Sequence, residues 1–169
     1  MHMKMKTLAV AAVLALSAAS ASAVNVFNLG DVTATGALYV TSSYGAAVAI
    51  DDTWNFSLTG NNDFAAQLAR NFSTANGAIS GFAATISGGT LVGSHALALD
   101  TAATSQVLTY GSLLGTGSYS LKVTGLTQRA NTKYTFNLDV TPVPEPETYG
   151  MLLAGMGVLA FVARRRKPV

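Results

Sequence analysis

Strict alternation of apolar and polar residues constrains the fold of this chain more than any other feature of its sequence. The alternation is clearest from Ile50 to Thr59, and it recurs from Ser118 to Thr124 and from Lys133 to Thr141. A repeat of two residues is typical of a β-strand with one buried face and one solvated face. Because residues 125–132 join the last two runs, we expect these runs to form an antiparallel pair. The apolar residues expected to face inward in this pair are Tyr119, Leu121, Val123, Tyr134, Phe136, Leu138 and Val140.

Weaker strand patterns fill most of the remaining chain between residues 24 and 141. Glycine or asparagine separates many of them, and Gly88-Gly89 predicts a tight hairpin turn. The run from Phe64 to Phe72 fits either a helix or a strand, and its strand neighbours favour a strand. Eight or nine short strands in one domain predict an all-β fold, a single antiparallel β-sandwich. The weaker strands are expected over residues 24–29, 35–41, 79–87, 90–99 and 106–113.

The first 23 residues have the features of a secretory signal peptide. Lys4 and Lys6 precede an apolar region, and Ala21 and Ala23 form an A-x-A cleavage site around Ser22. We expect the Sec machinery to export the chain and signal peptidase to cut it after Ala23. The alternative is a retained N-terminal helix.

The basic character of the chain belongs to its two ends. The whole sequence has 10 Lys and Arg against 8 Asp and Glu, which gives a net charge of +2. Six of the ten basic residues lie in the terminal segments, so four remain against the six Asp residues between Val24 and Val143, a net charge of −2. A domain without a basic stripe does not fit nucleic-acid binding.

Residues that could carry catalysis or hold a metal ion are sparse between Val24 and Val143. The chain has no cysteine, which removes disulfides and thiolate sites. His95 follows Ser94, but adjacent residues of a strand point to opposite faces and cannot act as a nucleophile and its base. The run of residues 61–63, Asn-Asn-Asp, predicts a turn, with calcium binding as the alternative. We therefore expect no enzyme activity, no catalytic residue, no metal site and no cofactor.

Asp52 interrupts the apolar face of the strand that begins at Ile50. Alternation places its carboxylate on the inner face with Ile50 and Trp54, where an unpaired charge is costly. We expect Asp52 to lie at the start of the strand and to accept backbone N–H bonds from the preceding loop. A calcium or ligand contact and an exposed position are the alternatives. Trp54 is expected in the core, and the alternative is an exposed platform for a sugar.

The tail of the chain has three parts in a fixed order. The motif Pro144, Glu145, Pro146 precedes an uncharged run from Tyr149 to Ala163. An apolar run before clustered Lys and Arg is typical of a membrane stop, and this one predicts a C-terminal transmembrane helix. The run spans only about 22 Å of a hydrocarbon core about 30 Å thick. The prolines of residues 141–148 predict a stiff spacer that holds the motif clear of the sandwich. The basic residues of the membrane stop are Arg164, Arg165, Arg166 and Lys167.

Together these parts resemble the PEP-CTERM sorting signal of Gram-negative bacteria. The resemblance rests on the Pro-Glu-Pro motif, Tyr149, the glycine-containing apolar run and the arginines. It implies that the tail is a transient membrane anchor and that the membrane protease-transpeptidase exosortase removes it. The protein would then move to the cell surface or the extracellular matrix. The alternative is an ordinary tail anchor with an accidental Pro-Glu-Pro.

A second resemblance concerns Ile50, Asp52 and Trp54. Their spacing is similar to the F-x-D-x-F motif of a PEP-CTERM subfamily, although Ile and Trp stand where that motif has Phe. This subfamily implies no particular activity.

The sequence therefore predicts a signal peptide (1–23), a β-sandwich (24–141) and a sorting signal (142–169). We expect an exported, non-enzymatic protein of the cell surface or extracellular matrix, and the PEP-CTERM resemblance implies an association with exopolysaccharide and biofilm. The alternative is a carbohydrate-binding module or adhesin on the same sandwich. An exposed aromatic strip or a groove of convergent polar side chains would favour the module. Buried aromatics beneath a smooth Ser/Thr surface would favour a matrix component.

Overall fold

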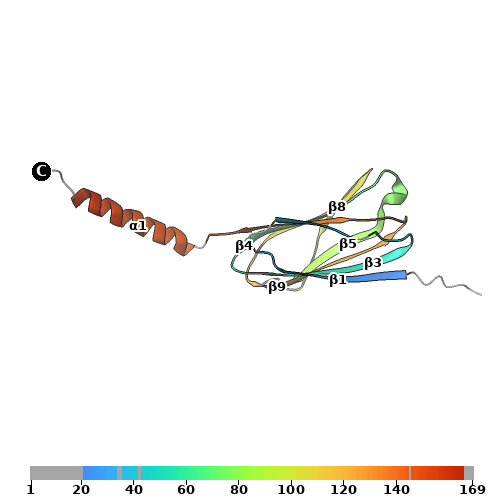
Figure 1. Cartoon of the computed structure of the whole chain (residues 1–169), viewed down its shortest axis with the longest axis horizontal. Coiled ribbons are helices and arrows are strands. Elements are labelled where there is room, and N and C mark those ends of the chain that lie inside the picture. The colour runs from blue at the N-terminus through green and yellow to red at the C-terminus, as the bar shows by residue number, and fades with distance from the viewer. Residues whose placement is uncertain (1–20, 34–35, 42, 145, 166–169) are drawn as a thin grey trace, which may run out of the picture.

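The computed structural model describes residues 21–33, 36–41, 43–144 and 146–165, and it shows two packed β-sheets followed by one long helix (Figure 1). The first sheet has the strand order β1 (Ala21–Asp31), β3 (Val48–Leu58), β9 (Gly117–Thr127), β5 (Ile79–Gly88), β6 (Ser94–Ala96). The second sheet has the order β2 (Gly36–Val40), β10 (Thr135–Pro142), β4 (Asn62–Asn71), β8 (Ser105–Leu114), β7 (Ala98–Ala102). A short 3-10 helix, η1 (Ala75–Gly77), precedes β5, and α1 (Pro146–Arg165) follows β10. The prediction of a mostly β, sandwich-like fold is confirmed.

The hydrophobic core lies between the two sheets. Burial alternates along β3 as its sequence predicts, and all apolar inner positions from Ile50 to Leu58 are buried. The ambiguous run from Phe64 to Phe72 falls largely in β4, which confirms the strand interpretation. Arg70 lies near the end of that strand, where its Nε donates to the Gly77 carbonyl oxygen (3.0 Å). The largest fully buried side chains are Tyr134, Phe64, Phe82, Phe136, Leu58, Leu68, Ile79, Ile86, Leu108, Leu114, Leu121 and Leu138.

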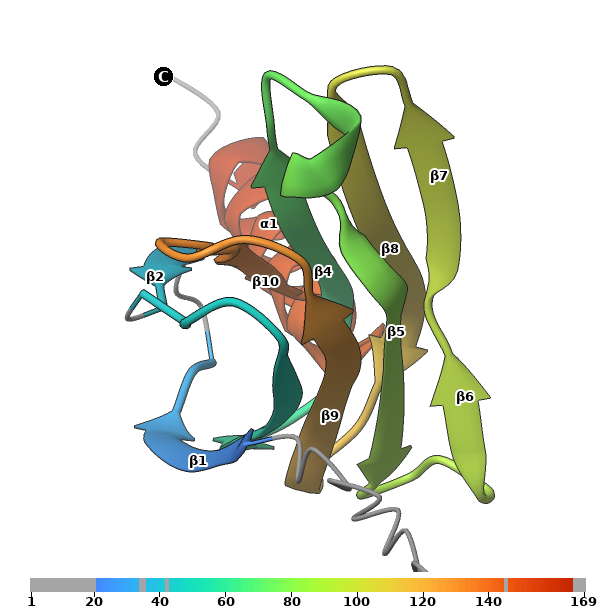
Figure 2. The same ribbon diagram turned by 90° about the vertical axis from the view of Figure 1, so that its right-hand side faces the viewer.

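One strand pair departs from the predicted antiparallel arrangement. β1 pairs with β3 in parallel, with Asn25 opposite Asp52 and Phe27 opposite Trp54. The route of the chain explains this pairing, because β2 lies in the other sheet, where it pairs with β10. The chain therefore leaves the first sheet after β1 and returns to it in the same direction, as a parallel pair requires. Figure 2 shows β1 and β2 at the same side of the sandwich, one in each layer.

The predicted pairing of the last two strands is wrong. β9 lies between β3 and β5 in the first sheet, whereas β10 lies between β2 and β4 in the second. Residues 128–134 are long enough to cross between the sheets. Thr132 fixes this crossing by exchanging backbone hydrogen bonds with Tyr44 (N···O 2.8 and 3.3 Å). The seven apolar residues of the two strands are nevertheless all buried, because facing sheets share one core.

Residues 90–99 form parts of two short strands rather than one. β6 ends at Ala96 in the first sheet and β7 begins at Ala98 in the second. Leu97 between them is buried, and its N–H donates to the Ala84 carbonyl oxygen (2.9 Å). The described part of the chain therefore has 10 strands rather than the predicted eight or nine. The predicted tight turn at Gly88-Gly89 is a longer connection that runs to Ser94, and both glycines have positive φ (98° and 54°).

Candidate functional site

Only a short connection separates the sandwich from the tail helix. β10 continues to Pro142, which lies opposite Asn62 of β4. The Val143 N–H then donates to the Asn61 carbonyl oxygen (2.8 Å), and α1 begins at Pro146. The predicted stiff spacer over residues 141–148 is therefore wrong, because strand and helix leave only residues 143–145 between them. We call residues 143–145 the joint.

The helix α1 carries charges that suit its own ends. Glu147 lies in its first turn, and Arg164 and Arg165 lie in its last turn, where they complement the helix dipole. The Arg165 guanidinium carbon lies 4.9 Å from the centre of the Phe161 ring, a cation–π contact. Every side chain that the structure describes in α1 is exposed, and the helix extends away from the sandwich (Figure 1).

The prediction of a transmembrane helix is not borne out. Among the residues that the structure describes, no helix is both long enough and apolar enough to cross a membrane. The polar first turn of α1 and the arginines of its last turn restrict its apolar part to the run from Tyr149 to Ala163. As a helix, that run is shorter than the thickness of a membrane's hydrocarbon core, which is about 30 Å.

Several residues of the predicted sorting and cleavage sites lie outside the described part of the chain. They are Glu145, Arg166, Lys167 and residues 1–20 of the predicted signal peptide. Ala21 and Ala23 are described, and they lie at the start of β1 opposite Val48 and Ile50. Pro144 is exposed in the joint.

Asp52 is the centre of a buried polar cluster. It lies inside β3 and is 0% exposed. The Asn25 Nδ2 donates to Asp52 Oδ1 at 2.7 Å, and the Tyr134 hydroxyl donates to Oδ2 at 2.5 Å. The Tyr44 hydroxyl also donates to Oδ2, and the Trp54 Nε1 donates to the Tyr134 hydroxyl at 3.0 Å. We call these five residues the Asp52 cluster.

Distant parts of the chain supply the cluster. Asn25 comes from β1, whose parallel register places it opposite Asp52. Tyr44 lies between β2 and β3 and is held by its backbone bonds to Thr132. Tyr134 comes from the end of the crossing that leads into β10. The cluster therefore ties both sheets to one carboxylate.

The electrostatics of the cluster keep its tyrosines protonated. Burial is the main cause that raises the pKa of Tyr134 far above its ordinary value, and the hydrogen bond to Asp52 and the charge of Asp52 raise it further. The same causes, in the same order, raise the pKa of Tyr44. Both hydroxyls therefore remain donors at neutral pH, and three donated hydrogen bonds compensate the burial of the Asp52 carboxylate.

The predicted setting of Asp52 is wrong in two respects. Asp52 lies within β3 (Val48–Leu58) rather than at the start of the strand. The carboxylate accepts its bonds from side chains inside the core rather than from backbone N–H groups of a preceding loop. Its neighbours Ile50 and Trp54 are each 2% exposed, as alternation predicts. The indole of Trp54 stacks on the Phe27 ring (centroids 3.9 Å apart), so the alternative of an exposed sugar platform is contradicted. The donors Asn25, Tyr44 and Tyr134 were not predicted as site residues.

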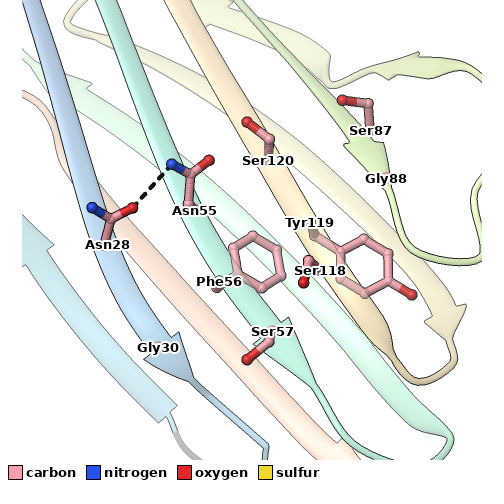
Figure 3. Close-up of a pocket in the computed structure, with 10 residues that line it drawn as sticks. All are labelled: Asn28, Gly30, Asn55, Phe56, Ser57, Ser87, Gly88, Ser118, Tyr119 and Ser120. Atoms are coloured by element: carbon pink, nitrogen blue, oxygen red, sulfur yellow. Dashed lines mark hydrogen bonds between the residues drawn. The ribbon is translucent and has the colours of Figure 1, made fainter.

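A shallow hollow of about 390 Å³ lies on the outer face of the first sheet (Figure 3). The strand register aligns four polar residues, one from each of four neighbouring strands, in a line across this hollow. Ser57 and Ser118, which also lie opposite each other, form a second tier. We call the four residues the polar row: Asn28 of β1, Asn55 of β3, Ser120 of β9 and Ser87 of β5. The alternation that turns Asn55 and Ser120 outward was visible in the sequence, but the alignment of the four residues depends on the register.

The remaining candidates do not assemble into a reactive site. His95 is exposed in β6, with its ring 6.3 Å from that of Tyr110. Asp51 faces outward and forms an ion pair with Lys122 (3.0 Å). Within the residues described, no group of three or more His, Cys, Asp or Glu side chains is placed to hold a metal ion.

Comparisons with known proteins bear mainly on the tail. The family model of the PEP-CTERM protein-sorting motif matches residues 142–167. The tail of this chain is a PEP-CTERM sorting motif. The motif marks the chain as an exported protein that is sorted by way of exosortase, in association with a membrane, toward the cell surface. The F-x-D-x-F resemblance stays a prediction.

The comparisons say less about the sandwich. No curated protein matches the chain. Among solved structures, the chain is similar to the pre-peptidase C-terminal domain of collagenase from Bacillus anthracis, with 13% identity and a TM-score of 0.42. That alignment covers 69% of this chain and 94% of the collagenase domain.

The PEP-CTERM motif overlaps the folded sandwich. Its match begins at Pro142, the last residue of β10, and continues through the joint into α1. The match therefore includes the last residue of a paired strand and the whole of α1.

Proposed function

We propose that this chain is a non-enzymatic protein of the cell surface or extracellular matrix whose PEP-CTERM tail is removed during sorting. In this proposal the Sec machinery exports the chain, signal peptidase cuts after Ala23, and exosortase acts at Pro144, Glu145 and Pro146. The observation that carries the proposal is the match of the sorting motif to residues 142–167, in which Pro144 and every described side chain of α1 are exposed.

The environment of Asp52 supports a non-enzymatic role for the sandwich. Asp52 is the buried carboxylate of the described core, and its two oxygens already accept three hydrogen bonds. A general acid or base must reach the proton that it transfers. Asp52 is 0% exposed, so no substrate in solution can reach it without unfolding the core. The cluster therefore stabilises the fold and holds the two sheets together.

The surface favours a matrix component over an aromatic sugar-binding strip. The large aromatic side chains of the described sandwich are buried or half-buried, and the exposed aromatic residues Tyr149 and Phe161 belong to α1. Association of the mature protein with exopolysaccharide in biofilm is the extension of this proposal that the PEP-CTERM resemblance implies.

A carbohydrate-binding module or adhesin is the second candidate function. The polar row favours it, because its amide and hydroxyl groups converge on one hollow. Pockets for small ligands use a few such polar groups to fix orientation.

Intact mass spectrometry of the protein from culture medium and from membranes of its host tests the sorting proposal. We expect the released species to begin at Val24 and to end near Pro144–Pro146. A variant with Pro144→Ala and Pro146→Ala should keep its tail, whereas the control Pro168→Ala, which also removes proline, should be processed normally. A membrane species that retains Arg164 and Arg165 in the unaltered protein, with no shortened species in the medium, would contradict the proposal.

A further inference from the structure

The outer face of the first sheet carries a continuous band of neutral polar groups. Asn28 lies opposite Asn55, Asn55 opposite Ser120, and Ser120 opposite Ser87. Ser94 of the edge strand β6 continues the line opposite Ser87. Adjacent strands lie about 4.8 Å apart, so the row offers a polar side chain at each such interval across the sheet.

The hollow at this row is formed by the sheet itself. Its inward-pointing neighbours Phe56 and Tyr119 are core residues, so the outer side chains stand on a rigid, packed layer. Gly30 and Gly88 line the hollow and add no side chain to it. Figure 3 shows Asn28, Asn55, Ser120 and Ser87 in this order on four neighbouring strands.

The groups of the row have unused hydrogen-bonding capacity. Asn55 Nδ2 donates to Asn28 Oδ1 (3.0 Å), which leaves the side-chain Nδ2 of Asn28 and the side-chain Oδ1 of Asn55 without a protein partner in the described part of the chain. The Ser87 and Ser120 hydroxyls likewise form no side-chain hydrogen bond with the described residues. Amides and hydroxyls both donate and accept, as do the hydroxyl groups of sugars.

The charge of the site selects among ligands. No Lys, Arg, Asp or Glu is among the residues that line the hollow. Lys122, two residues from Ser120 on the same strand, is paired with Asp51 (3.0 Å). Asp31, at the end of β1, accepts hydrogen bonds from the Thr33 N–H and the Thr59 hydroxyl. An anionic polymer would find no unpaired cation at the row, whereas a neutral polyhydroxylated chain fits its donors and acceptors.

We propose that the polar row binds a neutral polysaccharide chain laid across strands β1, β3, β9 and β5. This proposal deepens the carbohydrate-binding candidate above and rests on it. The row has no aromatic platform, so recognition relies on hydrogen bonds to successive sugars. Each hydrogen bond contributes little net affinity in water, so short oligosaccharides bind weakly and long chains, which present many copies of the repeat, bind more tightly.

Affinity electrophoresis of the full chain tests the proposal. The protein is run through gels that contain dextran, galactomannan, xylan or a soluble β-glucan, and through gels that contain alginate as the anionic probe. We expect retardation in at least one neutral gel and none in alginate. Raising the salt from about 50 mM to about 500 mM should leave the retardation unchanged, because no charge pair holds the ligand. Retardation confined to alginate, or abolished by salt, overturns the proposal.

Two variants and one control locate the site. Asn55→Ala and Ser120→Ala should each weaken binding about fivefold, the loss expected for one hydrogen bond. Asn137→Ala is the matched control, because Asn137 is an exposed asparagine of β10 in the other sheet. It should bind normally, and all three variants should keep the parent melting temperature. Equal binding by parent and row variants overturns the assignment of the site.

Failure of this proposal is distinguishable from failure of the sorting proposal. An absence of retardation in every neutral gel refutes the polar row as a polysaccharide site, while the intact mass of the released protein still reports on tail removal.

Discussion

The sandwich and the tail helix differ in how far their apolar side chains are exposed to solvent. Leu138 of β10 is 0% exposed, whereas Leu153 of α1, only fifteen positions later, is 68% exposed. The sandwich buries a carboxylate and surrounds it with donors, whereas α1 leaves its leucines and methionines in solvent. The difference shows that the two regions have separate sources of stability. The sandwich is stabilised by contacts within itself, and the tail has a composition suited to a partner or environment that the sandwich does not provide.

Among the substitutions that test this difference between the two regions, Asp52→Asn is expected to have the largest effect on the free energy of unfolding. An amide nitrogen would then face the hydroxyls that donate to the carboxylate, and at least one buried donor would lose its acceptor. We expect the free energy of unfolding to fall by about 3 kcal/mol. Urea denaturation measures the change, and tail removal should be unaffected.

Asp51→Asn is the control for this change, since it alters the neighbouring, outward-facing residue. Its ion pair with Lys122 is exposed, so less than about 0.5 kcal/mol should be lost. Similar losses in both variants, or an unchanged curve for Asp52→Asn, would contradict the role of the cluster.

A second effect is expected at alkaline pH. The pKa of Tyr44 and Tyr134 is raised in the folded state, so above about pH 10 the unfolded chain loses protons that the native state retains. The contribution of these two tyrosines to the free energy of unfolding should be fully present below that pH. Above it, the free energy of unfolding should fall by about 1.4 kcal/mol per pH unit for each tyrosine. Denaturation curves from about pH 8 to about pH 11 would show this slope.

Tyr134→Phe removes one of the two groups that cause the fall in the free energy of unfolding at alkaline pH. Its slope above about pH 10 should be roughly half that of the parent, although its stability at neutral pH is lower. Tyr149→Phe, in the exposed tail, should leave the slope unchanged. An identical slope in Tyr134→Phe and the parent would show that the cluster does not retain its protons.

The smallest effect is expected from the tail. Leu153→Ala should change the free energy of unfolding of the sandwich by less than about 0.5 kcal/mol, because the side chain is exposed. Leu138→Ala, the same substitution in the core, should cost about 3 kcal/mol. Thermal melts of the two variants would separate the regions, and a clear loss in Leu153→Ala would show that the helix supports the sandwich.

Local patterns predicted the faces of the strands but not their partners. Alternation identified the buried positions of β3, β9 and β10, because the period of two is a property of each strand alone. The choice of neighbour depends on where the connection goes. Residues 128–134 could close a hairpin or cross between sheets, and the packing of Tyr134 beside Asp52 accompanies the crossing.

Which residues of the candidate sites could be predicted also depends on whether their pattern is local in the sequence. The PEP-CTERM tail was identifiable because its motif, apolar run and basic residues are contiguous in the sequence. Asn25 and Tyr134, two of the donors to Asp52, were not identifiable, because they lie 27 and 82 residues away from it in the sequence. The polar row was hidden for the same reason, since it exists only once four strands are set in register.

The short joint has a mechanical consequence for sorting. Proteolysis is easiest in exposed, flexible segments, but here Val143 is still bonded to Asn61 and the helix begins at Pro146. A processing enzyme that needs a longer extended segment would have to separate the end of β10 from its neighbour or unwind the first turn of α1. Inserting about four Gly and Ser residues after Val143 should then accelerate tail removal in a pulse-chase experiment, and an unchanged rate would show that the joint is accepted as it stands. After the cut, the new C-terminus would lie at the end of the sandwich opposite the end where β1 begins (Figure 1). The two chain termini of the mature protein would therefore lie at opposite ends of the sandwich.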